Sequence, residues 1–537
     1  MSSARAIQGN IQHAEWRNRE AAVMAFCQIL EGTADLESMK VHVQTALPML
    51  IHLFAKGDEH ILVRDTAVFT ISEVCRLHTP ALVDARIDRS LFTNTITTLG
   101  TSLVAEPRLA ARACAAVCNC TLACAELEGA EGTALAQHVA PLLEQLWPCA
   151  ERADGAEANL RVQAYEAMTE LVQYWGRDDE TRALVRLDLV TLLQEVLRRL
   201  QASFAELDAA RAATRDSVEA VSGKQQALCA LVQVIVRALP KETAAAQLKG
   251  ALADHAMTLL LKVFDVKGPI AMEEAFMAIG AVATVLGADF AAYMALTHPV
   301  LVTGLQQVAE YQLCQAAVGT TGDICRALER GMMAATGTGE PFCDSIVGVL
   351  LTNLQNQELH RQVKPHMLSC FGDIALAVGG DFERYLSQVL VMLASASATT
   401  MPSDDDELIE YLNALRESVL EAYTGLIQGL NDHGKAGLLV TAANAPHVNA
   451  IFELATRIVA DEAEGQVEEA VLKAAIGVIG DLAMNLKGNL GQFLKHHEQM
   501  IIALITRGAS GDYGEDVSEM TRWAQAHITA ARSAAGA

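Results

Sequence analysis

In this 537-residue chain, a small residue recurs at the same position of successive helical stretches. This repetition limits the possible folds more than any other feature of the sequence. In the first third the small residue follows an arginine by eight positions, and the pairs are Arg19 and Cys27, Arg64 and Ser72, Arg108 and Ala116, and Arg161 and Thr169. Later a glycine takes its place at steps of 42, 50, 53 and 55 residues, at Gly280, Gly322, Gly372, Gly425 and Gly480. A glycine inside a helix costs about 1 kcal/mol relative to alanine. We therefore expect a neighbouring helix to pack closely at each of these positions.

Two helical stretches fill each repeat, because apolar residues recur at spacings of three and four and strand-like alternation is absent. Examples are 16–32 with 40–55, and 311–331 with 341–356. Helix pairs with this period are typical of HEAT-type solenoids. We predict an all-α fold, a right-handed superhelical α-solenoid of HEAT-type pairs with an armadillo-like fold. It would be one continuous array over 1–537, with about ten pairs, a terminal helix at 514–535 and no separate domains.

Two segments depart from the repeat. Residues 200–223 are polar and rich in alanine, which predicts an extended helix or a long connection. Residues 431–446 are weakly patterned, which predicts a loop or a distorted helix.

The charge balance limits the partners. The chain has 65 acidic and 40 basic residues, a net charge of −25, so we expect it to bind neither nucleic acid nor an anionic membrane. Basic partners would be attracted in a salt-dependent way. The N-terminus lacks the apolar stretch of a signal peptide, and the apolar segment 290–309 contains His298 and Pro299, which disfavour a membrane span. We therefore expect a soluble protein in a reducing compartment, since twelve cysteines in this length are no disulfide framework.

No set of residues predicts catalysis, a metal site or a cofactor. The cysteines at 114, 118, 120 and 124 are spread over more than one helix face and have no nearby histidine, so we interpret them as small core residues. The His496-His497-Glu498 run lacks the second histidine of a zinc protease motif. Gly337-Thr338-Gly339 lacks the lysine of a phosphate-binding loop and predicts an inter-helix turn. We therefore predict that the chain is not an enzyme.

Two features are candidates for ligand binding. The densest acidic block is Asp404, Asp405, Asp406 and Glu407, and the same helix face continues with Glu410 and Glu417. The block could cap a helix, or it could form an acidic patch for a basic ligand. Trp523 lies in the last helix with few apolar neighbours. It could cover the final repeat, or it could form an aromatic shelf for a lysine or arginine of a basic ligand.

Several stretches resemble the importin-β (karyopherin-β) family, in order and over essentially the whole chain. They include WRNREAAVMAF from Trp16, AEYQLCQAAVGTTGDICRALE from Ala309, PFCDSIVGVLL from Pro341, VKPHMLSCFGDIALAVGGDF from Val363 and YLNALRESVLEAYTGLIQGL from Tyr411. The match ends with Arg522-Trp523-Ala524.

The resemblance implies a nuclear transport receptor found in the cytoplasm, in the nucleus and at the nuclear pore. Its acidic concave surface would bind the basic helical segment of importin-α, or basic cargo directly. Phe-Gly nucleoporins would bind during passage, and RanGTP would release cargo. The ligand-binding residues that we predict are Trp523, Asp404, Asp405, Asp406, Glu407 and Glu410.

Two departures from the family pattern qualify this expectation. The chain begins at what resembles the middle of the family's array, so the N-terminal repeats that hold the main RanGTP site have no matching positions here. Ala115 stands where the family has a tryptophan. The alternative functions are a HEAT-repeat scaffold, or a receptor without Ran-regulated release.

Overall fold

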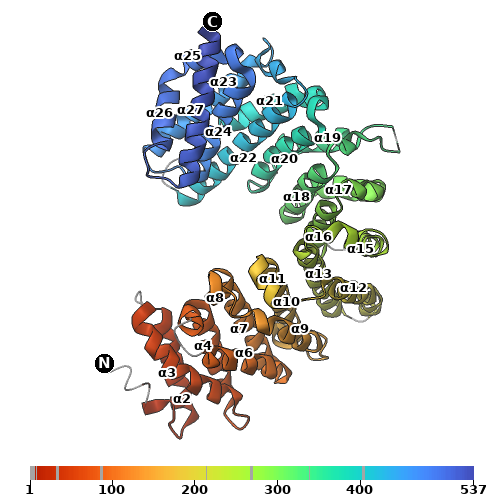
Figure 1. The fold of residues 1–537 in the computed structure, drawn as a ribbon. Helices are drawn as coiled ribbons and strands as arrows, with labels where there is room; N and C mark the ends of the chain where they lie inside the picture. Colours follow the sequence, from red (N-terminus) through yellow and green to blue (C-terminus); the bar gives the residue numbers. More distant parts are fainter. Residues whose placement is uncertain are drawn as a thin grey trace. The chain divides into compact units, whose positions relative to one another are not determined.

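Helices are the named elements of the chain in the computed structural model (Figure 1). The structure describes residues 7, 9–31, 36–84, 89–212, 214–266, 270–337, 339–401 and 405–536. The chain divides into two units, Met1–Leu259 and Leu260–Ala537, and α15 (Ala251–Val263) contains the boundary. The prediction of a single continuous array stays a prediction.

In the first unit, two layers of helices pack on each other. The helices of the first layer each contact the next, and they are α2 (Trp16–Glu31), α4 (Ile61–His78), α7 (Pro107–Ala125), α10 (Leu160–Gly176) and α13 (Arg215–Ala238). The second layer contains α3 (Leu36–Ala55), α6 (Ser90–Thr101), α9 (Ala136–Ala150) and α12 (Leu189–Arg211). The short elements are η1 (Ser102–Val104), η2 (Glu157–Asn159), α5 (Pro80–Val83), α8 (Gly129–Gly132), α11 (Asp179–Leu184) and α14 (Ala244–Leu248).

The second unit has the same two-layer plan. Its first layer is α16 (Met272–Leu286), α18 (Tyr311–Leu328), α20 (Val363–Val378), α22 (Asp406–Asn431), α24 (Glu469–Leu486) and α27 (Glu515–Gly536). Its second layer is α17 (Met294–Leu305), α19 (Phe342–Leu354), α21 (Glu383–Ser397), α23 (Ala445–Glu462) and α26 (Glu498–Gly508). The short elements are α25 (Gly491–His496), η3 (Gly287–Tyr293), η4 (Glu329–Met333), η5 (Gly379–Phe382), η6 (Ala436–Val440) and η7 (Lys487–Leu490). The predicted all-α class of HEAT-type helix pairs is confirmed.

Residues 431–446 fold as the sequence indicates, whereas 200–223 forms neither one extended helix nor a long connection. Helix α12 continues to Arg211, and α13 begins only four residues later at Arg215, so 200–223 extends two helices. Residues 431–446 contain the end of α22, the single turn η6 and the start of α23.

The repeated glycines lie at close contacts between first-layer helices. A Cβ atom at Gly425 would lie 2.5 Å from the Cα atom of Gly372, on the neighbouring helix α20. A Cβ atom at Gly322 would lie 2.5 Å from a carboxylate oxygen of Asp373, and one at Gly480 would overlap the indole of Trp523. Each glycine therefore leaves room for a group of the next repeat. This packing explains why a residue that destabilises an isolated helix occurs at these positions.

The stretch Met272–Leu305 is long and apolar enough to cross a membrane, and 56% of its most apolar window is buried. It is not one helix but α16, η3 and α17, joined where Gly287 takes a φ of 55°. All three elements pack against α18. We therefore interpret it as part of the helical core. The segment 290–309, whose His298 and Pro299 disfavour a membrane span, holds the end of η3, all of α17 and a turn.

Candidate ligand-binding groove

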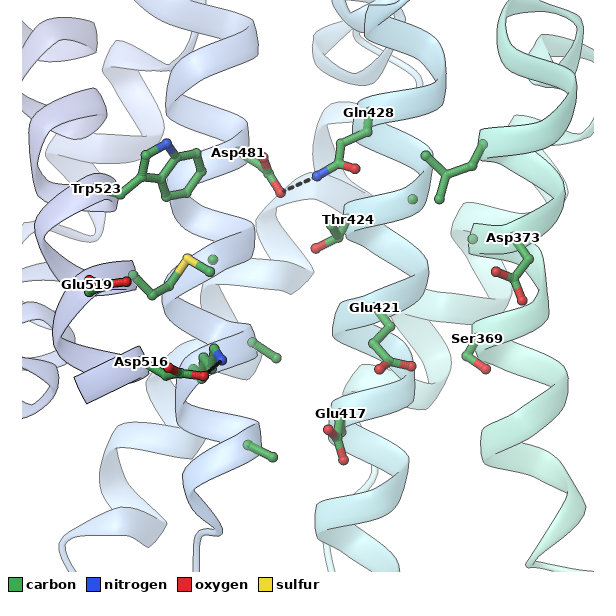
Figure 2. Close-up of a pocket in the computed structure, with 18 of the residues that line it drawn as sticks. Ser369, Asp373, Glu417, Glu421, Thr424, Gln428, Asp481, Asp516, Glu519 and Trp523 are labelled. Atoms are coloured by element: carbon green, nitrogen blue, oxygen red, sulfur yellow. Dashed lines mark hydrogen bonds and ion pairs between the residues drawn. The ribbon is translucent and has the colours of Figure 1, made fainter. Parts of the chain in front are cut away.

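A groove of about 1180 Å³ crosses the first layer of the second unit, over α18, α20, α22, α24 and α27. Figure 2 shows the part of it over α20, α22, α24 and α27. Most of its charged lining residues are acidic: Asp373, Glu417, Glu421, Asp481, Asp516 and Glu519. The basic lining residues are Arg326 and Lys473. The lining therefore has a formal charge of 2 − 6 = −4, which favours a cationic ligand.

The Gly-Asp pairs of the sequence place two of these carboxylates. Asp373 follows Gly372 and Asp481 follows Gly480, so each acid lies next to a close contact between first-layer helices. Arg326 on α18 bridges two carboxylates of adjacent repeats, with nitrogen–oxygen distances of 2.8 Å to Asp323 and 2.7 Å to Asp373. The arginine thus links α18 to α20 at one end of the groove.

The middle of the groove holds an unbalanced pair of acids on α22. Glu417 and Glu421 are one helical turn apart, and neither has an ion-pair partner among the described residues. Burial raises the pKa of Glu421, and the negative charges of Glu417 and Asp373 raise it further. A cation placed here would relieve both the repulsion and the desolvation, so this part of the groove favours a lysine or an arginine.

A second buried carboxylate lies beside the tryptophan. Asp481 is 5% exposed, and its Oδ2 accepts a hydrogen bond from the amide nitrogen of Gln428 at 3.2 Å. Burial raises the pKa of Asp481, which the Gln428 hydrogen bond and the nearby His527 partly offset. Burial therefore makes ionisation of this carboxylate cost free energy, and an incoming cation would reduce that cost.

Trp523 lines the same groove. Figure 2 shows its indole beside Asp481, with Glu519 and Asp516 one and two turns nearer the start of α27. The ring is half-buried, lies over Gly480 and meets the His527 ring edge-on at 5.0 Å between centroids. This position suits both interpretations of Trp523, because the ring packs on α24 and also faces the groove. Its ligand-binding role stays a prediction.

The acidic block lies elsewhere. Asp404 is outside the described residues. Asp405 caps α22, since its Oδ1 accepts hydrogen bonds from the backbone N–H groups of Glu407 at 3.0 Å and Leu408 at 3.4 Å. Glu407 forms an exposed ion pair with Arg361 at 3.1 Å. The described residues of the block support the capping interpretation, and their binding of a ligand stays a prediction.

Asp406 and Glu410 are exposed, and neither lines the groove. Glu410 precedes Glu417 by seven residues, which is about two helical turns, so both carboxylates lie on the same side of α22. Glu410 therefore lies outside the groove, on the same side of α22 as Glu417, which lines the groove.

An apolar pocket of about 520 Å³ lies elsewhere in the second unit, among residues of α16, α17 and α18 and the turn before them. Phe264 and Phe276 line it, with ring centroids 4.5 Å apart, and Met272, Pro299 and Leu313 add apolar surface. Glu310 and Asp265 are the acidic residues of its lining. A pocket of this composition suits an apolar side chain such as phenylalanine.

The cysteine cluster on α7 is largely buried. Cys114, Cys120 and Cys124 are buried, and burial together with the charges of Glu166 and Glu170 raises the pKa of Cys118 to about 12. In the described part of the chain, no three histidine, cysteine, aspartate or glutamate side chains are arranged to hold a metal ion. Cys114, Cys120 and Cys124 contribute small buried side chains to the packing of α7.

Comparison with known proteins gives consistent matches. Residues 94–508 match the family described as importin subunit beta-1-like, TPR repeats. The chain is 34% identical to importin subunit beta-1 of Arabidopsis thaliana over 530 residues, which cover 98% of this chain and 57% of that protein. The chain thus spans a little over half the length of this relative.

Solved structures agree with the sequence match. Importin-β crystallised from ammonium sulfate superposes with a TM-score of 0.84 at 28% identity, over 99% of this chain and 57% of that one. Kap95 in a Kap95:Nup1 complex gives 0.79 at 26% identity, and Kap95p bound to RanGDP gives 0.66 at 26%. Each of these two covers 99% of this chain and 57% of the other.

Proposed function

Since this chain belongs to the importin subunit beta-1-like family, we propose that it acts as a nuclear transport receptor that binds a basic helical segment in the acidic groove. The segment is that of importin-α, or of a basic cargo protein. The observation that carries the proposal is the groove itself, where carboxylates from four helices surround a space that Trp523 also lines.

The spacing of the groove suits a helix. Packed helices lie about 8 to 10 Å apart, so a ligand that crosses α20, α22, α24 and α27 meets acids at that interval. Two turns of an α-helix rise about 11 Å. A ligand helix with lysine or arginine at every seventh residue on one face would therefore meet successive host helices. Many modest ion pairs of this kind give fast and salt-sensitive association.

We assign the apolar pocket of Phe264 and Phe276 to a Phe-Gly segment of a nucleoporin. Its apolar lining suits a phenylalanine side chain, and its volume leaves room for the residues beside it. Kap95 in complex with Nup1, at 26% identity, supports a nucleoporin as partner.

The RanGDP-bound Kap95p structure likewise supports Ran as a third partner. A protein that uses these three partners would pass between cytoplasm and nucleus through the pore.

The proposal is tested by fluorescence anisotropy with a labelled N-terminal basic segment of importin-α. We expect binding at low ionic strength that weakens as salt rises, because three of the six groove carboxylates, Glu421, Asp516 and Glu519, are exposed to solvent. A peptide of the same length with its lysines and arginines replaced by glutamine is the control. No binding of the basic segment at low salt would contradict the proposal, and binding that salt does not weaken would favour the scaffold alternative.

A further inference from the structure

One lysine occupies a position in the groove that a basic ligand would otherwise use. Lys473 on α24 lines the groove, and the other described lining residues include no second lysine. Its Nζ lies 2.8 Å from Oδ2 of Asp516 on α27, and this ion pair lowers the pKa of Asp516. Figure 2 shows Asp516 on the same side of α27 as Glu519 and Trp523. The pair therefore neutralises one of the acids that the groove presents.

The fold has little need of this ion pair. The side chain of Lys473 is 38% exposed and that of Asp516 is 78% exposed, and exposed pairs of this kind stabilise a fold only slightly. The start of α27 is held on α24 in another way, since the backbone N–H of Gly514 donates to Oε1 of Glu469 at 3.0 Å. Asp516 also lies in the first turn of α27, where the helix dipole favours an acid without any lysine.

The other end of the groove differs. Arg326 is shared by two carboxylates, so one negative charge remains there, and Glu417 and Glu421 have no ion-pair partner among the described residues. The lysine thus cancels charge only where α24 meets α27.

We propose that Lys473 is a built-in competitor of the ligand: it holds Asp516 in the place of a ligand lysine and limits the affinity of the groove for basic segments. The inference rests on the proposed function, because it assumes that the groove binds a basic helix. A ligand cation that pairs with Asp516 competes with Lys473 for the same carboxylate and lies beside its ammonium group. Binding is consequently weaker than the carboxylates alone would allow, which eases release.

The test uses a fluorescein-labelled helical peptide with lysine or arginine at every third or fourth position, at low ionic strength, and the full chain. We expect Lys473→Met to bind the peptide about two- to fivefold more tightly than the unmodified chain. The matched control is Lys435→Met, which removes the same charge from an ion pair with Glu383, at 2.8 Å and of similar exposure, outside the groove. It should give a smaller gain.

A second variant ties the effect to Asp516. Asp516→Asn alone should weaken binding, since it leaves the ammonium group unpaired in the groove. The combination of both changes should return the affinity close to that of the unmodified chain. Equal or weaker binding by Lys473→Met, or an equal gain in Lys435→Met, would overturn the inference. Absence of peptide binding by every variant and by the unmodified chain would instead contradict the proposed function.

Discussion

Replacing Gly425 by alanine perturbs a close backbone contact between α20 and α22. The new methyl group would lie 2.5 Å from Cα, 2.6 Å from the oxygen and 2.7 Å from the carbonyl carbon of Gly372. Ordinary van der Waals contact begins at 3.4 Å, so α20 and α22 must separate by 3.4 − 2.5 = 0.9 Å, because neither backbone has a side chain that can move aside. A gap of this size loses about a quarter to a half of the dispersion energy of the affected contacts.

Overpacking of this kind costs about 1 to 3 kcal/mol, while alanine returns up to about 1 kcal/mol of helix propensity. The matched control is Gly319→Ala in α18, where an added Cβ meets nothing within 4 Å. The Gly319→Ala variant gains the higher helix propensity of alanine but introduces no steric clash. The difference in free energy of unfolding between the two variants, measured by urea denaturation, should therefore be about 1 to 3 kcal/mol, with Gly425→Ala the less stable. Equal stability of the two variants would refute the close-packing role of the repeated glycines.

Three further predictions concern the groove and one turn. Trp523→Ala should weaken binding of a basic peptide by about 0.5 to 2 kcal/mol with unchanged circular dichroism; a loss of helicity would support the covering role instead. Peptide affinity should fall as the pH is lowered from about 7 toward the ordinary glutamate value of 4.5, since the raised pKa of Glu421 makes this residue lose its charge early, and Glu421→Gln should flatten the profile of Kd against pH. Glu329 has a φ of 47° where the corresponding turns have Gly287 and Gly379, so Glu329→Gly should raise the free energy of unfolding by up to about 2 kcal/mol; a lower urea midpoint would contradict this.

The fold followed from the sequence because one local rule repeats. The small position of each repeat leaves room for a neighbouring helix, so the steps between Gly280 and Gly480 predicted both the helices and close contacts between them. Helix limits were also close: 16–32 was predicted where α2 spans Trp16–Glu31, and 311–331 where α18 and η4 span Tyr311–Met333.

The residues of the groove were predicted from the sequence only in part. Trp523 was predicted and lies in the groove, whereas the block from Asp404 was chosen for its density of charge along the chain. A dense run of acidic residues at the start of a helix is explained by helix capping. Whether acids from different helices come together in space depends on which face of its helix each acid occupies. Asp373 and Asp481 each follow a repeated glycine in the sequence, and this Gly-Asp pattern identifies acids that lie beside helix contacts. Glu421, Asp516 and Glu519 had no such signal.

The central claim is that the carboxylates in the middle of the groove bind a basic helix. It is tested most directly by the Kd of the labelled importin-α segment for the double variant Glu417→Gln/Glu421→Gln. The control is Glu340→Gln/Glu358→Gln, which changes the net charge equally at exposed positions outside the groove. We predict a Kd about five- to thirtyfold higher for the groove variant and little change for the control, since each unpaired carboxylate lost removes about 0.5 to 1 kcal/mol of binding free energy. Equal affinities of the two variants would contradict the claim.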